Sequence, residues 1–244
     1  MNKNSVVIIG AGRSGRGCVG ELYDGEGDVI TYVDKNSELV DALRRQKSYT
    51  VYKYSEDGKE TVRTIAGYHV LHPQKDRAAY MDALMAADLV STATYPDGFD
   101  AIVEDIPELV RKKMAADNKK PMAITLGANY VGLLEYYQNH LDGLLSEEEK
   151  AFQRQFVPLV ASIIYRSSSY ASGEQLAKDP LAVQGDDWDY LQVEQSAFRF
   201  GEEYELPKFF LPEDDILKLM TLKIWIGNTL HCSYAFLGHY YGLS

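Results

Sequence analysis

Cysteine is scarce in this sequence. The 244 residues include two cysteines, Cys18 and Cys232, which lie far apart and match no metal-binding or redox spacing. Domains that depend on disulfide bonds or on a zinc knuckle carry more cysteines at closer spacings. The sequence therefore indicates neither kind of site, and we expect a protein of a reducing compartment.

Positive charge and long apolar runs are also lacking. The 25 Lys+Arg face 36 Asp+Glu, and the resulting net charge of −11 repels phosphate backbones and anionic lipid surfaces. The first apolar run, residues 6–9, is much too short for a signal-peptide core, and no later run is long enough to cross a bilayer. No internal repeat or low-complexity tract is present. We therefore expect a soluble, cytoplasmic protein without nucleic-acid or membrane partners.

The first segments of the chain predict an α/β fold. Residues 6–9 form a β-branched run without polar alternation, as is typical of a strand buried on both faces of a parallel sheet. A glycine-rich loop follows, then a helical pattern through residues 18–23 and a second strand over residues 29–33. This order is that of one βαβ unit.

A small antiparallel excursion is predicted next. Residues 50–54 alternate with period two, and Asp57-Gly58 is a strong hairpin turn. The returning strands are expected over residues 61–65 and 68–71. We interpret this segment as an insertion in the nucleotide-binding fold and not as a separate domain.

Alternation of helices and strands then resumes and continues to about residue 165, which predicts a Rossmann-type, doubly wound, mostly parallel sheet. Beyond that point the alternation is lost, and a long helix is expected after Pro212. We predict an NAD-binding domain over residues 1–165. Residues 166–244 are expected to begin a mainly helical substrate region that is short at its C-terminus.

The loop after the first strand, residues 10–15, carries the G-x-G-x-x-G pattern of dinucleotide-binding loops, whose glycines allow a tight turn and close approach of a pyrophosphate. Asp34 ends the second strand, where a carboxylate accepts ribose hydrogen bonds and favours NAD, although Lys35 beside it leaves NADP open. Arg13 and Arg16 are candidates to face a phosphate. A purely solvent-exposed role is the alternative for these charged residues. The predicted cofactor site comprises Gly10, Gly12, Arg13, Gly15, Arg16, Asp34 and Thr94.

A second motif lies in the last predicted helix, Lys223-Ile224-Trp225-Ile226-Gly227-Asn228-Thr229-Leu230-His231. At 100° per residue, Asn228 lies roughly 140° and His231 roughly 80° around the helix from Lys223, so the three share one broad face. The residues between them are mostly apolar, and buried polar groups need partners. In the alternative interpretation, Lys223 pairs with an acid such as Glu213 and His231 is an interior histidine.

These motifs resemble the polyol-specific long-chain dehydrogenases, the mannitol dehydrogenase family. The family signature K-x-x-x-x-N-x-x-H is matched without a gap by Lys223, Asn228 and His231. The resemblance covers the chain from its first strand to its last residue. It implies that Lys223 is the general base, that Asn228 and Asn129 hold the substrate oxygen, that His231 binds a substrate hydroxyl, and that no metal ion takes part.

Three features depart from the family pattern. Ala128 stands where the family has an acid before the asparagine, Tyr165-Arg166 replaces an Asp-Arg pair, and the chain stops shortly after the signature helix. His69 and His72 are expected in a strand and a turn, where their spacing does not bring both to one side, so they do not suggest a metal site.

The sequence thus predicts an NAD-dependent oxidoreductase that moves a hydride between a secondary alcohol of a polyol or polyol phosphate and NAD. Two other classes stay open. One is a dinucleotide-binding module without catalytic activity. The other is a hydroxyacid or sugar-acid dehydrogenase that also uses a lysine and an asparagine on a helix. The partner is expected to be a small polyol or sugar phosphate, and the sequence leaves the oligomeric state open.

Overall fold

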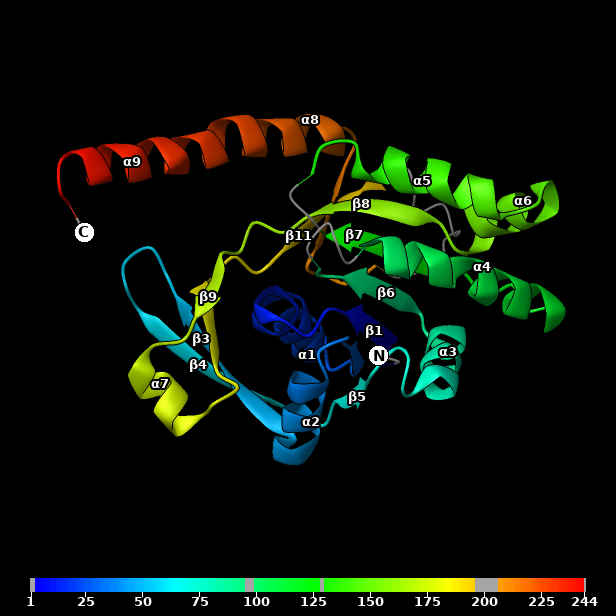
Figure 1. Cartoon of the computed structure of the whole chain (residues 1–244), viewed down its shortest axis with the longest axis horizontal. Coiled ribbons are helices and arrows are strands. Elements are labelled where there is room, and N and C mark those ends of the chain that lie inside the picture. Colours follow the sequence, from blue (N-terminus) through cyan, green and yellow to red (C-terminus); the bar gives the residue numbers. More distant parts are fainter. Residues whose placement is uncertain (1–2, 95–98, 128–129, 196–205, 244) are drawn as a thin grey trace.

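A mostly parallel sheet forms the centre of the molecule (Figure 1). The computed structural model describes residues 3–94, 99–127, 130–195 and 206–243. Among these residues, eight strands are ordered β12-β11-β8-β7-β6-β1-β2-β5 in this sheet. Their bounds are Ser5–Ile9 (β1), Val29–Val33 (β2), His69–Leu71 (β5), Leu89–Thr92 (β6), Ala123–Gly127 (β7), Leu159–Ile163 (β8), Leu191–Glu194 (β11) and Phe210–Glu213 (β12).

The strand order places a topological switch point beside β1. Strands β2 and β5 continue the parallel sheet on one side of β1, while β6, β7 and β8 continue it on the other. The loops after β1 and β6 therefore diverge, and ligands of such sheets bind in the resulting crevice at the carboxyl ends of the strands. The predicted Rossmann-type fold is confirmed, with β11 pairing antiparallel to β8 near one edge.

Helices cover both faces of the sheet. The described helices that lie over the sheet are α1 (Glu21–Glu26), α2 (Ser37–Gln46), α3 (Arg77–Ala86), α4 (Phe99–Ala115), α5 (Leu133–Leu144) and α6 (Glu147–Phe156). Along β1, Val6 and Ile8 pack with α1 and α2, while Val7 and Ile9 pack with α3, α4 and α5. Both sets are apolar because successive side chains of a strand point to opposite faces and both faces are buried here.

The predicted excursion is part of a second sheet of mixed direction. Among the described residues its order is β4-β3-β10-β9, with bounds Glu60–Ala66, Ser48–Tyr54, Val183–Asp186 and Ser168–Tyr170. The β3–β4 hairpin is antiparallel as expected, but β10 runs parallel to β3. The strand expected over residues 68–71 is present as β5, yet it is wrong as a member of the excursion, because it pairs parallel to β2 in the main sheet.

Residues beyond 165 also contribute to both sheets, so the predicted division at that position does not coincide with the end of either sheet. The strands β9 and β10, with α7 (Gly173–Lys178) between them, belong to the second sheet, and β11 and β12 belong to the first. These strands join sheets begun far earlier in the chain, which local periodicity does not reveal. The mainly helical part begins only after β12.

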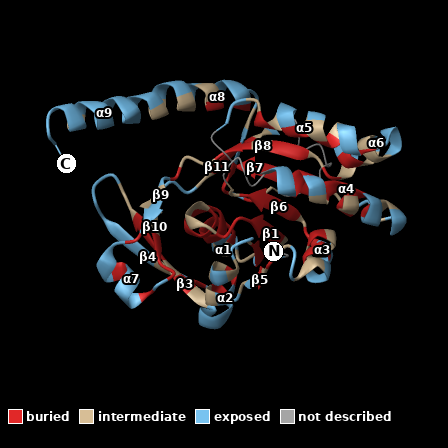
Figure 2. Ribbon diagram, in the orientation of Figure 1, coloured by how far each residue is buried: buried red, intermediate tan, exposed pale blue. Residues whose placement is uncertain are grey.

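That helical part is one continuous rod along the top of the molecule in Figure 1. It consists of α8 (Ile216–Leu222), a π-helical turn (Lys223–Asn228) and α9 (Thr229–Tyr240). The Asp215 carboxylate accepts a hydrogen bond from the Lys218 amide at 3.0 Å and so caps the first turn, as the acidic segment there predicts. Figure 2 shows α9 exposed over nearly its whole length. In the part of the chain that the structure describes, no helix has both the length and the apolar character needed to cross a bilayer.

Candidate active site

The glycine loop follows β1 at the switch point and requires glycine at two of its three positions. Gly10 has φ +100°, and a Cβ there would lie 2.5 Å from the Ala93 carbonyl oxygen. A Cβ on Gly15 would overlap the Gly10 carbonyl oxygen. Gly12 differs, because a Cβ there would meet nothing within 4 Å. The first and third glycines thus close the turn, while the second leaves open space over the backbone.

Asp34 is half-buried at the end of β2 and bonds to the glycine loop. Its carboxylate accepts the Ala11 amide at 2.8 Å and the Asn36 amide at 2.8 Å. A carboxylate offers about four lone-pair sites, so two such bonds leave capacity for a ribose hydroxyl. The predicted residue therefore lies in contact with the predicted loop, as a dinucleotide site requires.

The two loop arginines have different surroundings. Arg16 is buried, its guanidinium donates to the carbonyl oxygens of Ala11 and Leu181, and burial lowers its pKa. These contacts join the loop to the segment before β10, and they favour a role in holding the loop over one in contacting phosphate. Arg13 is half-buried, with its guanidinium 3.9 Å from the centroid of the exposed Tyr170 ring.

Thr94, two residues beyond β6, adds a polar group to this crevice. Its hydroxyl is buried, and no described residue forms a hydrogen bond with it. The Thr94 methyl lies beside Gly10, 2.9 Å from where a Cβ would be. A buried hydroxyl without a partner costs free energy unless a ligand or water satisfies it. The open backbone at Gly12, the Asp34 carboxylate and this hydroxyl together fit a bound dinucleotide.

Lys223 lies at the same edge of the sheet. Its amine donates a hydrogen bond to the carbonyl oxygen of Ile164, the residue that follows β8. Because β8, β7, β6 and β1 are all parallel, this carbonyl lies at the edge where the glycine loop begins. Burial lowers the pKa of the Lys223 amine to about 8, an effect that the nearby Cys18 partly opposes. Cys18 lies in the helical turn Gly15–Gly20, which follows the glycine loop and leads into α1. The structure thus brings this lysine to the cofactor crevice.

The helix is not a regular α-helix at the signature. Residues Lys223–Asn228 form a π-helical turn, in which hydrogen bonds join positions five apart and not four. Asn228 is therefore about one turn from Lys223, and the α-helical projection made from the sequence is wrong over this segment. Asn228 is half-buried and His231 is exposed. Asn129, the other predicted oxygen ligand, lies outside the described residues.

The side chains around Lys223 are not indicated by any local sequence pattern. The amine lies 5.0 Å from the centroid of the Tyr165 ring, which stacks at 6.0 Å on the Trp188 indole. The neighbouring Arg166 is fully buried and donates to the Gly17 carbonyl oxygen at 2.8 Å and to Glu21 at 2.9 Å. Arg166 thus binds the residues that follow the glycine loop. These two partners lie 149 and 145 positions away in the chain, a separation at which no local pattern indicates pairing.

Residues 4–206 match the family model described as the mannitol dehydrogenase Rossmann domain. The chain belongs to the mannitol dehydrogenase family. Among curated proteins, mannitol-1-phosphate 5-dehydrogenase of Streptococcus mutans is 26% identical over 238 residues, which cover 97% of this chain and 60% of that protein. The resemblance inferred from the sequence is therefore confirmed.

Solved structures agree with the fold of this mannitol dehydrogenase family member. D-sorbitol dehydrogenase in its substrate-free form has a TM-score of 0.72 at 15% identity, covering 91% of this chain and 56% of that one. Octopine dehydrogenase in complex with NADH and agmatine has a TM-score of 0.55 at 13% identity, covering 90% of this chain and 51% of that one. The chain thus spans between about half and three fifths of the length of these relatives.

Proposed function

We propose that this chain binds NAD and carries the general base of a polyol oxidoreductase. The reaction is hydride transfer between a secondary alcohol of a polyol or polyol phosphate and NAD. The observation that carries the proposal is the position of the Lys223 amine, which lies at the carboxyl edge of the sheet beside the glycine loop with a pKa lowered to about 8. Family membership and the name of the Streptococcus mutans relative support the polyol class.

In this proposal the Lys223 amine acts in its neutral form. A lysine with an ordinary pKa is almost fully protonated near neutral pH. With a pKa of about 8, a larger fraction of the molecules has an unprotonated amine that can accept the hydroxyl proton. The Ile164 carbonyl accepts one N–H and so orients the amine. The bound nicotinamide, when present, supplies the hydride acceptor. The protein's own contribution is to remove the proton and to hold the alcohol.

Asn228 and His231 complete the proposed substrate contacts. The half-buried Asn228 amide is about one π-helical turn from Lys223 and is a hydrogen-bond donor for the oxygen that gains negative charge. His231 is exposed on α9 and would bind a hydroxyl further along the substrate. Asn129 follows β7, two residues beyond its end at the carboxyl edge, and is proposed as the second amide donor.

NAD is proposed over NADP because of Asp34. Its carboxylate is held against the loop by the Ala11 and Asn36 amides, so it cannot swing away from a 2′-phosphate without losing both bonds. Calorimetric titration of the protein with NAD and NADP tests this directly. We expect tighter binding of NAD, with the preference reduced or reversed in Asp34→Ser. Equal affinities in the unchanged protein would contradict the assignment.

Turnover is tested by following NADH absorbance with mannitol, D-sorbitol and mannitol 1-phosphate. The proposal predicts NAD reduction with at least one of them and loss of that activity in Lys223→Ala. Retained NAD binding without turnover on any polyol would instead support a dinucleotide-binding module. A thermal-shift measurement with NAD separates the two outcomes, because a ligand at 100 times its dissociation constant stabilises the folded state by about 2.7 kcal/mol.

A further inference from the structure

An aromatic cluster continues from the Lys223 amine toward a pocket on the second sheet. The Tyr165 ring contacts the amine on one side and stacks on the Trp188 indole, with an angle of 28° between the ring planes. Tyr190 packs edge-on against Trp188 at 5.5 Å between centroids. One ring, Tyr165, thus separates the proposed base from the indole. A six-carbon substrate held at Lys223 would extend along this cluster.

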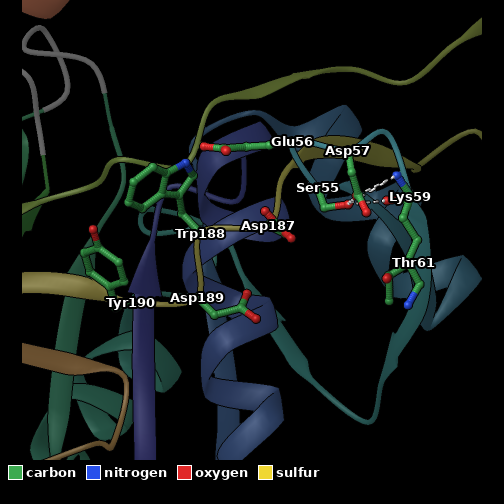
Figure 3. Close-up of a pocket in the computed structure, with 9 residues that line it drawn as sticks. All are labelled: Ser55, Glu56, Asp57, Lys59, Thr61, Asp187, Trp188, Asp189 and Tyr190. Atoms are coloured by element: carbon green, nitrogen blue, oxygen red, sulfur yellow. Dashed lines mark hydrogen bonds between the residues drawn. The ribbon is translucent and has the colours of Figure 1, made fainter.

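The pocket is a cavity of about 700 Å³ between the β3–β4 hairpin and the segment before β11. Figure 3 shows the rings of Trp188 and Tyr190 at one side of it and the hairpin residues at the other. Its lining residues are Ser55, Glu56, Asp57, Lys59, Thr61, Asp187, Trp188, Asp189 and Tyr190. Apolar rings that face hydroxyl and carboxylate groups suit a molecule that carries both C–H faces and hydroxyls.

The segment that carries Trp188 and Asp189 is bonded to the buried Arg166 side chain. Arg166, whose side chain is 0% exposed, donates to the Trp188 carbonyl oxygen at 2.8 Å and to the Asp189 carboxylate at 2.5 Å. Lys53 makes a second ion pair with Asp189 at 3.0 Å. Since Arg166 also binds Glu21, the segment that carries Trp188 is connected through Arg166 to α1. This side of the pocket is therefore anchored to the body of the protein.

The charge in the pocket is negative. Asp189 is paired with Arg166 and Lys53, but Glu56, Asp57 and Asp187 also line the cavity, and Lys59 is the one cation among its lining residues. Asp57 accepts a hydrogen bond from Ser55, which leaves its charge in place. Carboxylates around a cleft repel a phosphate dianion and accept hydrogen bonds from hydroxyl groups.

We propose that Trp188 is a specificity-determining residue that packs against the carbon chain of the substrate, and that the pocket beside it receives an uncharged, hydroxyl-bearing end. This inference rests on the proposed function and narrows its substrate class, because it makes an unphosphorylated polyol the preferred substrate over its phosphate. The stacked wall supplies contact area, and the hairpin carboxylates supply acceptors for the hydroxyls.

A fluorescence experiment tests binding apart from turnover. The chain has two tryptophans, so Trp225→Phe leaves Trp188 as the sole indole. In the presence of saturating NAD, we expect mannitol or D-sorbitol to change the Trp188 emission in a saturable way, and mannitol 1-phosphate to need an at least tenfold higher concentration. Emission that none of the three changes, or that the phosphate changes at the lowest concentration, would overturn the inference.

Kinetics test specificity. Trp188→Ala should raise the KM for the polyol about tenfold while changing kcat less than threefold, because the lost contact is remote from the hydroxyl proton that Lys223 is proposed to remove. Trp225→Ala, a change of the exposed tryptophan of the rod, is the matched control and should leave KM unchanged. An unchanged KM in Trp188→Ala would refute the role of the indole.

Charge reversal tests the pocket itself. The double variant Glu56→Lys and Asp187→Lys should shift the ratio of kcat/KM for mannitol over mannitol 1-phosphate by about tenfold toward the phosphate. An unchanged ratio would place the phosphate elsewhere and overturn the pocket assignment. If no polyol or phosphate is turned over and none changes the emission, the proposed function fails as well. If the protein turns over a polyol but these variants keep the KM and the kcat/KM ratio of the unchanged protein, only the inference about Trp188 and its pocket fails.

Discussion

The glycine loop and the terminal rod meet at one edge of the sheet but are built differently. The loop is enclosed: Gly10 and Gly15 leave no room for a side chain, and Asp34 and Arg16 bond to its backbone. The rod is held near its start, where Lys223 contacts Ile164 and Tyr165, and its continuation α9 is exposed. Cofactor binding should therefore depend on a rigid, self-contained unit, and proton transfer on a single anchored side chain.

The sharpest way to separate these regions is Lys223→Ala. The variant should lower kcat by about 10²–10⁴-fold, because it removes the proposed general base, while the dissociation constant for NAD changes less than threefold. Steady-state NADH absorbance measures the first quantity and calorimetry the second. Lys218→Ala, a change of an exposed lysine five residues earlier on the same rod, is the matched control and should keep full activity. A Lys223→Ala enzyme with kcat near the native value would break the comparison.

A second pair of variants tests the enclosure of the loop. Gly15→Ala forces a methyl group onto the Gly10 carbonyl and should lower the free energy of unfolding by about 3 kcal/mol. Gly12→Ala meets open space and should leave unfolding within about 0.5 kcal/mol of native while weakening NAD binding about tenfold. Urea unfolding and calorimetry provide the measurements. Equal stability losses in both variants would contradict the open space at Gly12, and an unchanged NAD affinity in Gly12→Ala would contradict its assignment as a ligand site.

What the sequence could predict follows the same division. The βαβ unit and its loop were predictable because the residues that determine them are close together in the sequence, between Val6 and Asp34. The position of Lys223 was implied by a resemblance, not by spacing. Its π-helical turn was not predictable, since the contacts at Ile164 and Tyr165 come from a strand end distant in sequence. The parallel pairing of β10 with β3 likewise depends on tertiary contacts, which local strand propensity does not indicate.

Arg166 joins Glu21 of α1 to the segment before β11, and its neighbour Tyr165 contacts Lys223, so the removal of Arg166 tests how much this buried network contributes to stability. Arg166→Met leaves the buried Glu21 with fewer partners and should cost about 3 kcal/mol of unfolding free energy. Arg154→Met, which breaks a solvent-exposed pair with Asp142, is the matched control and should cost less than about 1 kcal/mol. Urea titration measures both. Similar losses in the two variants would show that the buried network adds nothing beyond a surface pair.

The pH dependence of turnover by the unchanged protein tests the Lys223 amine without a substitution. In the proposed mechanism the neutral Lys223 amine is the reactive form, so kcat/KM should rise about tenfold per pH unit up to a pKa of about 8 and then level off. Burial raises the pKa of the Tyr165 phenol and raises that of the Cys18 thiol to about 12, so neither neighbour titrates in this window.

The same shift has a defined sign for stability. The folded state disfavours the protonated amine, so between about pH 8 and the ordinary lysine value of 10.5 the unfolded chain binds a proton that the folded chain does not. Through this group, the free energy of unfolding should therefore rise with pH over that window, and Lys223→Met should remove the rise. A kcat/KM profile that is flat between pH 6 and 9 in the native enzyme, measured with saturating NAD, would mean that the anchored amine is not the base.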